Sequence, residues 1–402
     1  MSEAVNIPQL RFPGFSGEWE DGKLGNYGNL INGLTYSPDN IVDDGLLVLR
    51  SSNVQNGQIY LNDNVYVNLD VDDAALTRED DILICVRNGS KRLIGKSTII
   101  NKNLPKSTHG AFMTVFRGES NKFISHWFHS SIYYKEVHKN LGATINSING
   151  SNLKKFKTIF PAKSEQQKIA SFLTAVDTKI EQLSKKQELL GEYKKGLMQK
   201  IFSQAIRFKA DDGSEFPDWE EKKLGDLIAE ISDGGTPPTS NKGNFGGGIN
   251  WVVIDDIRDE IRITKETLTE TGLSNSSSKL WKPETIILST GATIGRVGIA
   301  KIYTTTKQGV CGIVVNQFTS NLFLKYWFIF NINLLKRFSQ GSSIKEVRPP
   351  TLIKFDISTP SLPEQTKIAN FLSSIDSKIE QVGKQLDESK QFKKALLQQM
   401  FV

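Results

Sequence analysis

The chain has 402 residues, and 50 Lys and Arg against 44 Asp and Glu leave a net charge of +6. This length predicts two or three domains of roughly 150 residues each, and only two cysteines, Cys85 and Cys311, both in apolar runs, exclude a disulfide-stapled module. The first residues carry no secretory leader and Lys325 interrupts the longest apolar run, so we expect a cytoplasmic protein without a membrane segment.

Residues 1–160 are predicted to form a first domain of mixed α/β structure. Apolar runs bounded by turn residues predict strands at 46–49, 81–86, 97–100 and 111–116, followed by a helix over 121–140. His126 and His129 lie three residues apart on that helix, but without a third ligand they are interpreted as ordinary, partly exposed histidines and not as a metal site.

Residues 161–205 are predicted to contain a long helix, with Pro161 as a start signal and Ser164 as its N-cap. Apolar residues recur every 3.5 positions, and such a stripe needs a partner helix, although packing on its own domain alone is an alternative. The stretch 185–209 supplies +5 of the net charge, either as a solvated face or as a surface for another subunit or a nucleic-acid backbone. The predicted seam consists of Ile169, Leu173, Val176, Ile180 and Leu183.

Residues 206–360 repeat the plan of the first domain, and residues 361–402 repeat the long helix. Strands are predicted at 249–254, 285–288, 296–300 and 312–315, with a helix near 321–338. The seam predicted for the second long helix consists of Ile368, Leu372, Ile375, Ile379 and Val382.

The sequence contains an internal repeat that fills the chain. Glu165-Gln166 returns as Glu364-Gln365, and the offset of 199 holds without a gap to Phe202 and Phe401, with nearly half of the positions identical. The strand-rich segments share patterning but little identity. Residues alike in both copies should meet a shared demand, and residues that differ should distinguish the copies.

Signals of catalysis are sparse. The sequence contains no Walker loop, no dinucleotide fingerprint, no nucleophile elbow and no clustered Cys/His pattern. Adjacent acids such as Asp255-Asp256 allow a nuclease with a dispersed active site as an alternative, but such pairs are common in turns. We therefore expect a chain without catalytic activity of its own, without a bound cofactor and without a metal.

Several motifs together resemble the specificity subunit of type I restriction–modification systems. They are the two helix starts, from Pro161 to Ala170 and from Pro360 to Ala369, the domain openings around Trp19 and Trp219, and the stretch from Gly234 to Pro237. The resemblance covers the full chain. It implies an α+β fold in which two similar mixed α/β target recognition domains are separated by two long antiparallel coiled-coil helices with a pseudo-twofold repeat.

The resemblance also implies a function and partners. Each recognition domain would read one half of a split sequence in double-stranded DNA, while the helices would set the spacer and dock two methyltransferase subunits that carry S-adenosylmethionine. Two further restriction subunits, dependent on ATP and Mg, would translocate and cut DNA. The alternative is a coiled-coil scaffold that organises protein partners without touching DNA.

Loops rich in small, amide and basic residues are the candidate DNA contacts, because such side chains bind phosphates and base edges. Any one of them can instead be an ordinary turn, and the loop register between the domains is open, since pairing Gly89 with Gly291 requires an offset of 202. The candidates in the first domain are Arg50, Ser51, Asn53, Arg87, Asn88, Gly89, Ser90, Lys91, Arg92, His109 and Gly110. Those in the second are Gly235, Thr236, Lys242, Thr290, Gly291, Thr293, Arg296, Lys307 and Gln308.

Overall fold

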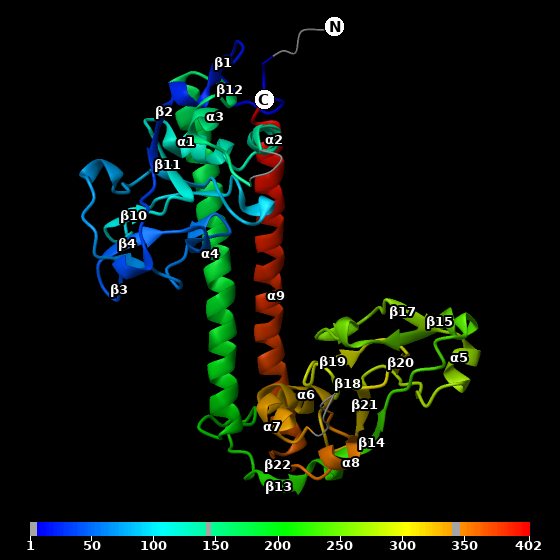
Figure 1. The fold of residues 1–402 in the computed structure, drawn as a ribbon. Coiled ribbons are helices and arrows are strands. Elements are labelled where there is room, and N and C mark those ends of the chain that lie inside the picture. The colour runs from blue at the N-terminus through cyan, green and yellow to red at the C-terminus, as the bar shows by residue number, and fades with distance from the viewer. Residues whose placement is uncertain (1–5, 142–145, 340–345) are drawn as a thin grey trace. The chain divides into compact units, whose positions relative to one another are not determined.

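The computed structural model describes residues 6–141, 146–339 and 346–402 (Figure 1). The chain divides into two compact units, Met1–Lys185 with Gly383–Val402, and Lys186–Val382. Each unit combines one strand-rich head with a part of each long helix. None of the helices within the described ranges is long and apolar enough to cross a membrane.

The first head contains two four-stranded sheets, in the orders β2-β11-β8-β9 and β10-β4-β7-β3. Strand β8 is apolar throughout because both of its faces are covered. Leu83 and Cys85 pack with β4, whereas Ile82 and Ile84 pack with the helices. The strands are β1 (Glu20–Lys23), β2 (Gly28–Asn32), β3 (Ile41–Val42), β4 (Leu46–Leu49), β5 (Val54–Gln55), β6 (Gln58–Ile59), β7 (Tyr66–Val67), β8 (Ile82–Cys85), β9 (Ser97–Ile99), β10 (Ser107–His109), β11 (Met113–Gly118) and β12 (Lys157–Phe160).

The second head follows the same plan, with sheets β14-β21-β18-β19-β16 and β17-β15-β20. The side chains of its central strand β18 again alternate between the two faces of the sheet: Ile286 and Leu288 face the helices, and Ile287 faces the second sheet. The strands are β13 (Glu220–Lys223), β14 (Ile228–Asp233), β15 (Phe245–Val252), β16 (Glu260–Ile261), β17 (Glu266–Leu268), β18 (Ile286–Ser289), β19 (Val297–Ala300), β20 (Thr304–Thr306), β21 (Val310–Val315) and β22 (Asp356–Thr359).

The predicted single helix of each head is wrong, because each is broken into two. In the first head the Ser130 hydroxyl accepts a hydrogen bond from the Tyr133 amide and caps a new helix. His126 is also buried and not partly exposed. The short helices are α1 (Asn121–Trp127), α2 (Ser131–Asn140), α3 (Gly150–Lys154), α5 (Glu270–Ser274), α6 (Asn321–Phe330), α7 (Ile332–Arg337) and α8 (Pro349–Leu352).

The two long helices are α4 (Lys163–Phe202) and α9 (Leu362–Gln399). Ser164 lies inside the first turn of α4, so its prediction as the N-cap is wrong; the Ala162 carbonyl accepts the first amide bonds. Within each unit the helices run antiparallel and share a core with the head, so packing of a helix on its own domain alone is excluded. The shared residues are Ile169 and Leu173 with Leu396 and Met400 in one unit, and Met198 and Ile201 with Ile368 and Leu372 in the other.

The remaining seam residues differ in burial. Ile375 and Val382 are buried, whereas the others are partly exposed. These partly exposed positions are Val176, Ile180, Leu183 and Ile379.

Candidate nucleic-acid interface

The candidate loops of the two heads are held by equivalent backbone hydrogen bonds, which we call the shared frame. In the first head the Phe112 carbonyl accepts from the amides of Val86 and Arg87, and in the second the Gly309 carbonyl accepts from the amides of Thr290 and Gly291. Equal hydrogen bonds therefore make Gly291 the counterpart of Arg87, not of Gly89, which resolves the open loop register.

The frame also shows where the heads differ in length. Gly95 donates to the carbonyl of Cys85 at the end of β8, and Gly295 donates to the carbonyl of Ser289 at the end of β18. The loop between these points spans residues 86–94 in the first head and only 290–294 in the second. The first head thus has extra loop residues, and the basic side chains Lys91 and Arg92 belong to this longer loop.

Two of the predicted loops of the first head meet. The Asn88 side-chain amide donates to the Ser51 hydroxyl at 3.0 Å, which joins the loop after β4 to the loop after β8. Arg50 pairs with Asp63 at 2.9 Å. Candidates with exposed side chains or backbone in the longer loop are Arg87, Gly89, Ser90, Lys91 and Arg92.

Three predicted contact residues of the first head lie under the surface. Asn53 is fully buried, and its amide group bonds to the Tyr60 carbonyl and the Arg50 amide. His109 was predicted in a loop but lies in the buried strand β10, with Nε2 3.0 Å from the Ile31 carbonyl. Burial lowers the pKa of His109, so the ring is neutral. Gly110 is buried beside it, and these residues support the loops in this conformation.

In the second head the loops around Gly235 and Lys307 meet at Trp251. The Trp251 indole donates to the Gly235 carbonyl at 3.1 Å, and the Lys307 ammonium lies 5.0 Å from the centroid of the same ring. Thr236, next to Gly235, is half-buried, and Gln308, next to Lys307, is exposed.

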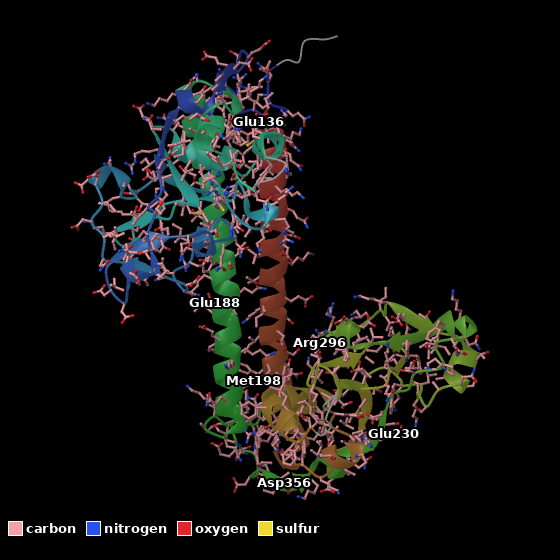
Figure 2. All side chains as sticks on the ribbon, in the orientation of Figure 1. Glu136, Glu188, Met198, Glu230, Arg296 and Asp356 are labelled. Atoms are coloured by element: carbon pink, nitrogen blue, oxygen red, sulfur yellow. The ribbon has the colours of Figure 1, made fainter. Side chains whose placement is uncertain are left out.

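The loop after β18 combines buried and exposed candidates. Thr290 and Gly291 are buried, whereas Thr293 and Arg296 are exposed. Arg296, which is labelled in Figure 2, is paired with Asp255 at 3.0 Å. Lys242 is exposed on a short 3-10 helix, Lys242–Asn244, that packs on α5.

A buried arginine–glutamate clamp holds the start of each long helix, and the sequence analysis missed it. Arg207 Nε and Nη2 each donate to Glu364 at 2.9 Å, and Glu364 is fully buried. Arg11 makes the same two bonds to the buried Glu165 at 2.8 and 2.7 Å. The repeated glutamate of the Glu-Gln pair thus has a structural explanation. The repeat did not reveal the two arginines, because Arg11 and Arg207 lie 196 residues apart, whereas Glu165 and Glu364 lie 199 residues apart.

The repeated lysine and aspartate of the long helices form cross-helix ion pairs. Lys194 lies 2.5 Å from Asp376, which also accepts from the Tyr326 hydroxyl at 2.7 Å. In the other unit Lys393 lies 2.5 Å from Asp177. The equivalent of Tyr326 there is the buried His126. Lys394 and Lys195 continue the repeat on the exposed face.

The basic stretch 185–209 is partly neutralised. Lys194 and Arg207 are paired as described, and Lys209 pairs with Glu215 at 2.6 Å. This stretch should therefore attract a polyanion less strongly than its net charge of +5 indicates.

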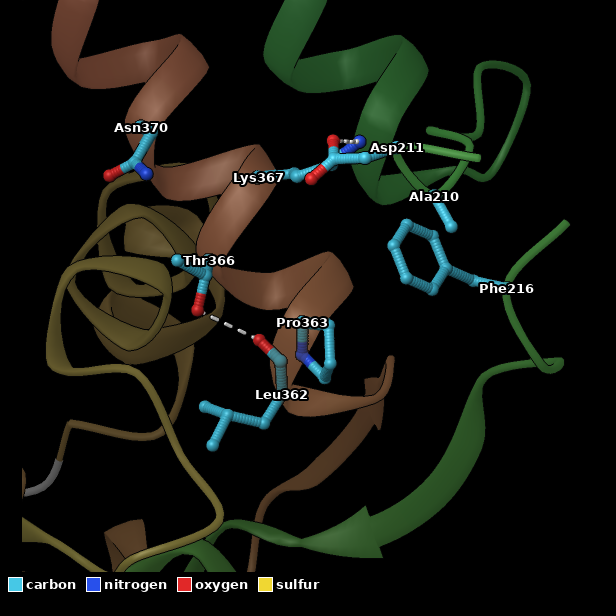
Figure 3. A pocket seen from close by; sticks show the side chains of 8 residues that line it. All are labelled: Ala210, Asp211, Phe216, Leu362, Pro363, Thr366, Lys367 and Asn370. Atoms are coloured by element: carbon cyan, nitrogen blue, oxygen red, sulfur yellow. Dashed lines mark hydrogen bonds and ion pairs between the residues drawn. The ribbon is translucent and has the colours of Figure 1, made fainter. Parts of the chain in front are cut away.

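An open cavity of about 650 Å³ lies at the start of α9 (Figure 3). Lys367 crosses it to pair with Asp211 at 2.6 Å. Within the described parts of the chain, no group of three His, Cys, Asp or Glu side chains is placed to hold a metal. The cavity is lined by Ala210, Asp211, Phe216, Leu362, Pro363, Thr366, Lys367 and Asn370.

Two heads with one frame and different loop side chains, each followed by a long helix, define a duplicated recognition protein. The family described as type I restriction modification DNA specificity domain matches residues 16–190 and 217–388. The chain belongs to this family and is a type I restriction–modification specificity subunit with two target recognition domains. The predicted fold class and family are confirmed.

Relatives and solved structures agree with this assignment. The chain is 27% identical over 398 residues to the MjaX specificity subunit of Methanocaldococcus jannaschii, which covers 94% of this chain and 92% of the relative. It is 36% identical over 191 residues, 46% of this chain and 44% of the relative, to the MjaIX specificity subunit of the same organism. The fold is similar to that of the S subunit from M. genitalium, with a TM-score of 0.64, 16% identity, and coverage of 98% and 99% of the two chains.

Proposed function

We propose that each head reads one half of a bipartite DNA target, with no catalysis by this chain. The observation that carries the proposal is the shared backbone frame, which holds Arg87 in one head and Gly291 in the other at equivalent positions. One frame with different side chains suits two half-sites of different sequence. Lysine and arginine side chains would supply affinity for phosphates, and loop side chains would select bases.

The long helices would set the spacer between the half-sites and hold two methyltransferase subunits. In this proposal S-adenosylmethionine is held by those subunits, and ATP with Mg by restriction subunits. A solved structure of similar fold, with a TM-score of 0.55, is described as the structural basis of complex assembly and conformational transition of the type I R-M system. This similarity supports assembly of the chain with other subunits.

Exchanging residues 1–160 for the corresponding head of a relative tests the reading of half-sites. We expect only one half of the methylated sequence to change when the complex with its methyltransferase is expressed and its modified sites are mapped. The exchange of residues 206–360 is the matched control and should change only the other half. A change in both halves after either exchange would show that the heads do not read separately.

A salt titration separates DNA recognition from a scaffold role. Binding of the complex to random duplex should weaken steeply with rising salt, because phosphate contacts release counterions. The scaffold alternative predicts no such dependence.

Two exposed aromatic residues at equivalent repeat positions are the proposed docking points for the methyltransferase subunits. Tyr193 on α4 and Phe392 on α9 are 56% and 53% exposed, and they lie one repeat offset apart. Two like partners need two like surfaces, and exposed aromatics are frequent binding hot spots.

Replacing either aromatic by aspartate should remove one of two methyltransferase subunits. We expect a loss of about 2 kcal/mol or more of binding free energy at that position, and the double variant should purify without methyltransferase. Native mass spectrometry measures the subunit count. Tyr303→Asp, 63% exposed in the second head, is the control and should keep both subunits. Two bound subunits in the double variant would place docking elsewhere.

A further inference from the structure

An exposed aromatic ring and an arginine form a stacked pair on the frame of the first head. The Arg87 guanidinium carbon lies 5.7 Å from the centroid of the Phe112 ring, within the range of a cation–π contact. Phe112 is 57% exposed, and Arg87 is exposed. Phe112 was predicted inside a strand over 111–116, but β11 begins at Met113, so Phe112 lies in the turn that precedes it.

The backbone that carries this pair is held on both sides. The Phe112 carbonyl accepts two amide bonds from Val86 and Arg87, at 3.0 and 3.1 Å. On the other side Arg87 forms a β-bridge with Ser147, and the Ile148 amide donates to the Val86 carbonyl. An exposed ring on a fixed backbone loses little conformational freedom when it binds, which favours a contact surface over a loose turn.

The loop that carries Arg87 is positively charged, and its charged side chains are unpaired. Arg87, Lys91 and Arg92 have no carboxylate partner among the residues that the structure describes. By contrast, Arg296 in the second head is paired with Asp255. An exposed ring held by a loop with free arginine and lysine side chains matches a phosphate backbone with stacked or methyl-bearing bases.

The second head has no side chain at either equivalent position. Hydrogen bonding makes Gly291 the counterpart of Arg87 and Gly309 the counterpart of Phe112. Lone exposed apolar residues are common and need no function. Here, however, the Phe112 ring lies on the frame that both heads share, and the second head has no ring at that position. This difference is expected for a residue that distinguishes two half-sites.

We propose that Phe112, supported by Arg87, packs against bases of the half-site read by the first head and determines the sequence preference of that half. The inference rests on the proposed function. Phe112 supplies the apolar contact, to a thymine methyl group or the face of a base, and Arg87 supplies a contact to phosphate or to a guanine edge.

The test uses the complex with its methyltransferase subunits and a duplex library randomised in both half-sites. For Phe112→Ala we expect relaxed selection in one half only, about tenfold weaker binding to the preferred duplex, and unchanged binding to random duplex. Arg87→Ala should in addition reduce the salt dependence of binding. Phe318→Ala, 66% exposed in the second head beyond the opposite end of β21, is the matched control and should leave both halves unchanged.

Two negative results have different meanings. If the unaltered complex selects no sequence from the library, the proposed function fails. If it selects two half-sites and Phe112→Ala keeps both selections and the affinity, only the role of Phe112 is refuted. Thermal unfolding of Phe112→Ala should match that of the unaltered chain, because the ring is mostly exposed and the frame uses its backbone; a lowered midpoint would assign Phe112 to folding and also refute the inference.

Discussion

Replacing Arg207 by alanine should lower the free energy of unfolding of the unit Lys186–Val382 by about 3–5 kcal/mol. The substitution leaves the Glu364 carboxylate buried, with the Trp219 indole at 3.3 Å as the side-chain donor that remains among the described residues. A buried carboxylate that loses its ionic partner keeps the cost of desolvation without the compensating charge. Chemical denaturation followed by tryptophan fluorescence measures the effect, since Trp219 lies at the clamp.

Two variants separate this cause from a general effect of losing an arginine. Arg262 Nε and Nη2 both donate to one oxygen of Glu260, but both side chains are exposed, so Arg262→Ala should cost less than about 1 kcal/mol. Adding Glu364→Gln to Arg207→Ala should recover part of the lost stability, because a neutral amide is easier to bury than a carboxylate. If the double variant is no more stable than Arg207→Ala, the buried charge is not the cause.

The clamp illustrates what the repeat in the sequence predicts and what it does not. Identity between the copies marked Glu165 and Glu364 as residues under a shared demand, and both proved to be buried ligands of an arginine. Their partners were missed because connecting segments of different length shift Arg11 and Arg207 out of register. A repeat thus identifies residues with a common role but not the contacts that cross from one segment to another.

Apolar patterning predicted the central strands and the long helices, because β8, β18, α4 and α9 bury continuous or periodic apolar residues. It missed β10 and β20, which consist of Ser, Thr and His. These polar residues can be buried because side chains among them form internal hydrogen bonds, as the Thr108 hydroxyl does to the Ala75 carbonyl. Bonds of this kind depend on the fold and leave no period in the sequence.

The candidate contact residues were selected by residue type, which does not report exposure. Asn53 and His109 have side chains that could read bases, but both side chains form hydrogen bonds inside the first head. Phe112 was not among the candidates because it was predicted inside the strand over 111–116 and not in a loop. Its exposure follows because β11 starts at Met113, two residues later than predicted, a shift smaller than strand boundaries in a sequence can resolve.

Acid should destabilise the first unit before the second. All four histidines lie in Met1–Lys185, and burial lowers the pKa of His126, to about 3, and of His109 and His129. Asp177 lies 3.7 Å from His126 Nδ1, but Lys393 is closer to that carboxylate and its charge opposes protonation of the imidazole. The ring is therefore neutral in the folded protein.

Because the folded pKa of these groups is below the unfolded value near 6.5, the unfolded state binds more protons as the pH falls. Stability is unaffected above pH 6.5 and is lost progressively below it. His126 alone should cost about 2 kcal/mol at pH 5, and His109 and His129 add losses of the same sign. Carboxylates with a lowered pKa, such as Glu284, contribute only below their ordinary value near 4.5. The loss of stability expected between pH 7 and pH 5 is thus assigned to the histidines, because a carboxyl with a raised pKa, such as Asp233, gains stability as the pH falls.

Amide hydrogen exchange at pH 7 and pH 5, corrected for the intrinsic rate, can follow the two units separately. We expect the core strands β8 and β11 to lose protection at pH 5, while β18 and β21 keep it. His126→Gln should reduce the loss, because glutamine does not titrate, and His138→Gln is the control. Equal losses in both units would assign the acid sensitivity to carboxylates and refute the role of the buried histidines.

The equivalent of His126 in the second unit is Tyr326, which bonds Asp376 and remains neutral across this range because its pKa is raised by burial. At this helix contact only the first unit therefore has an imidazole in place of the tyrosine. As the pH falls from 7 to 5, the first unit should become less stable than the second.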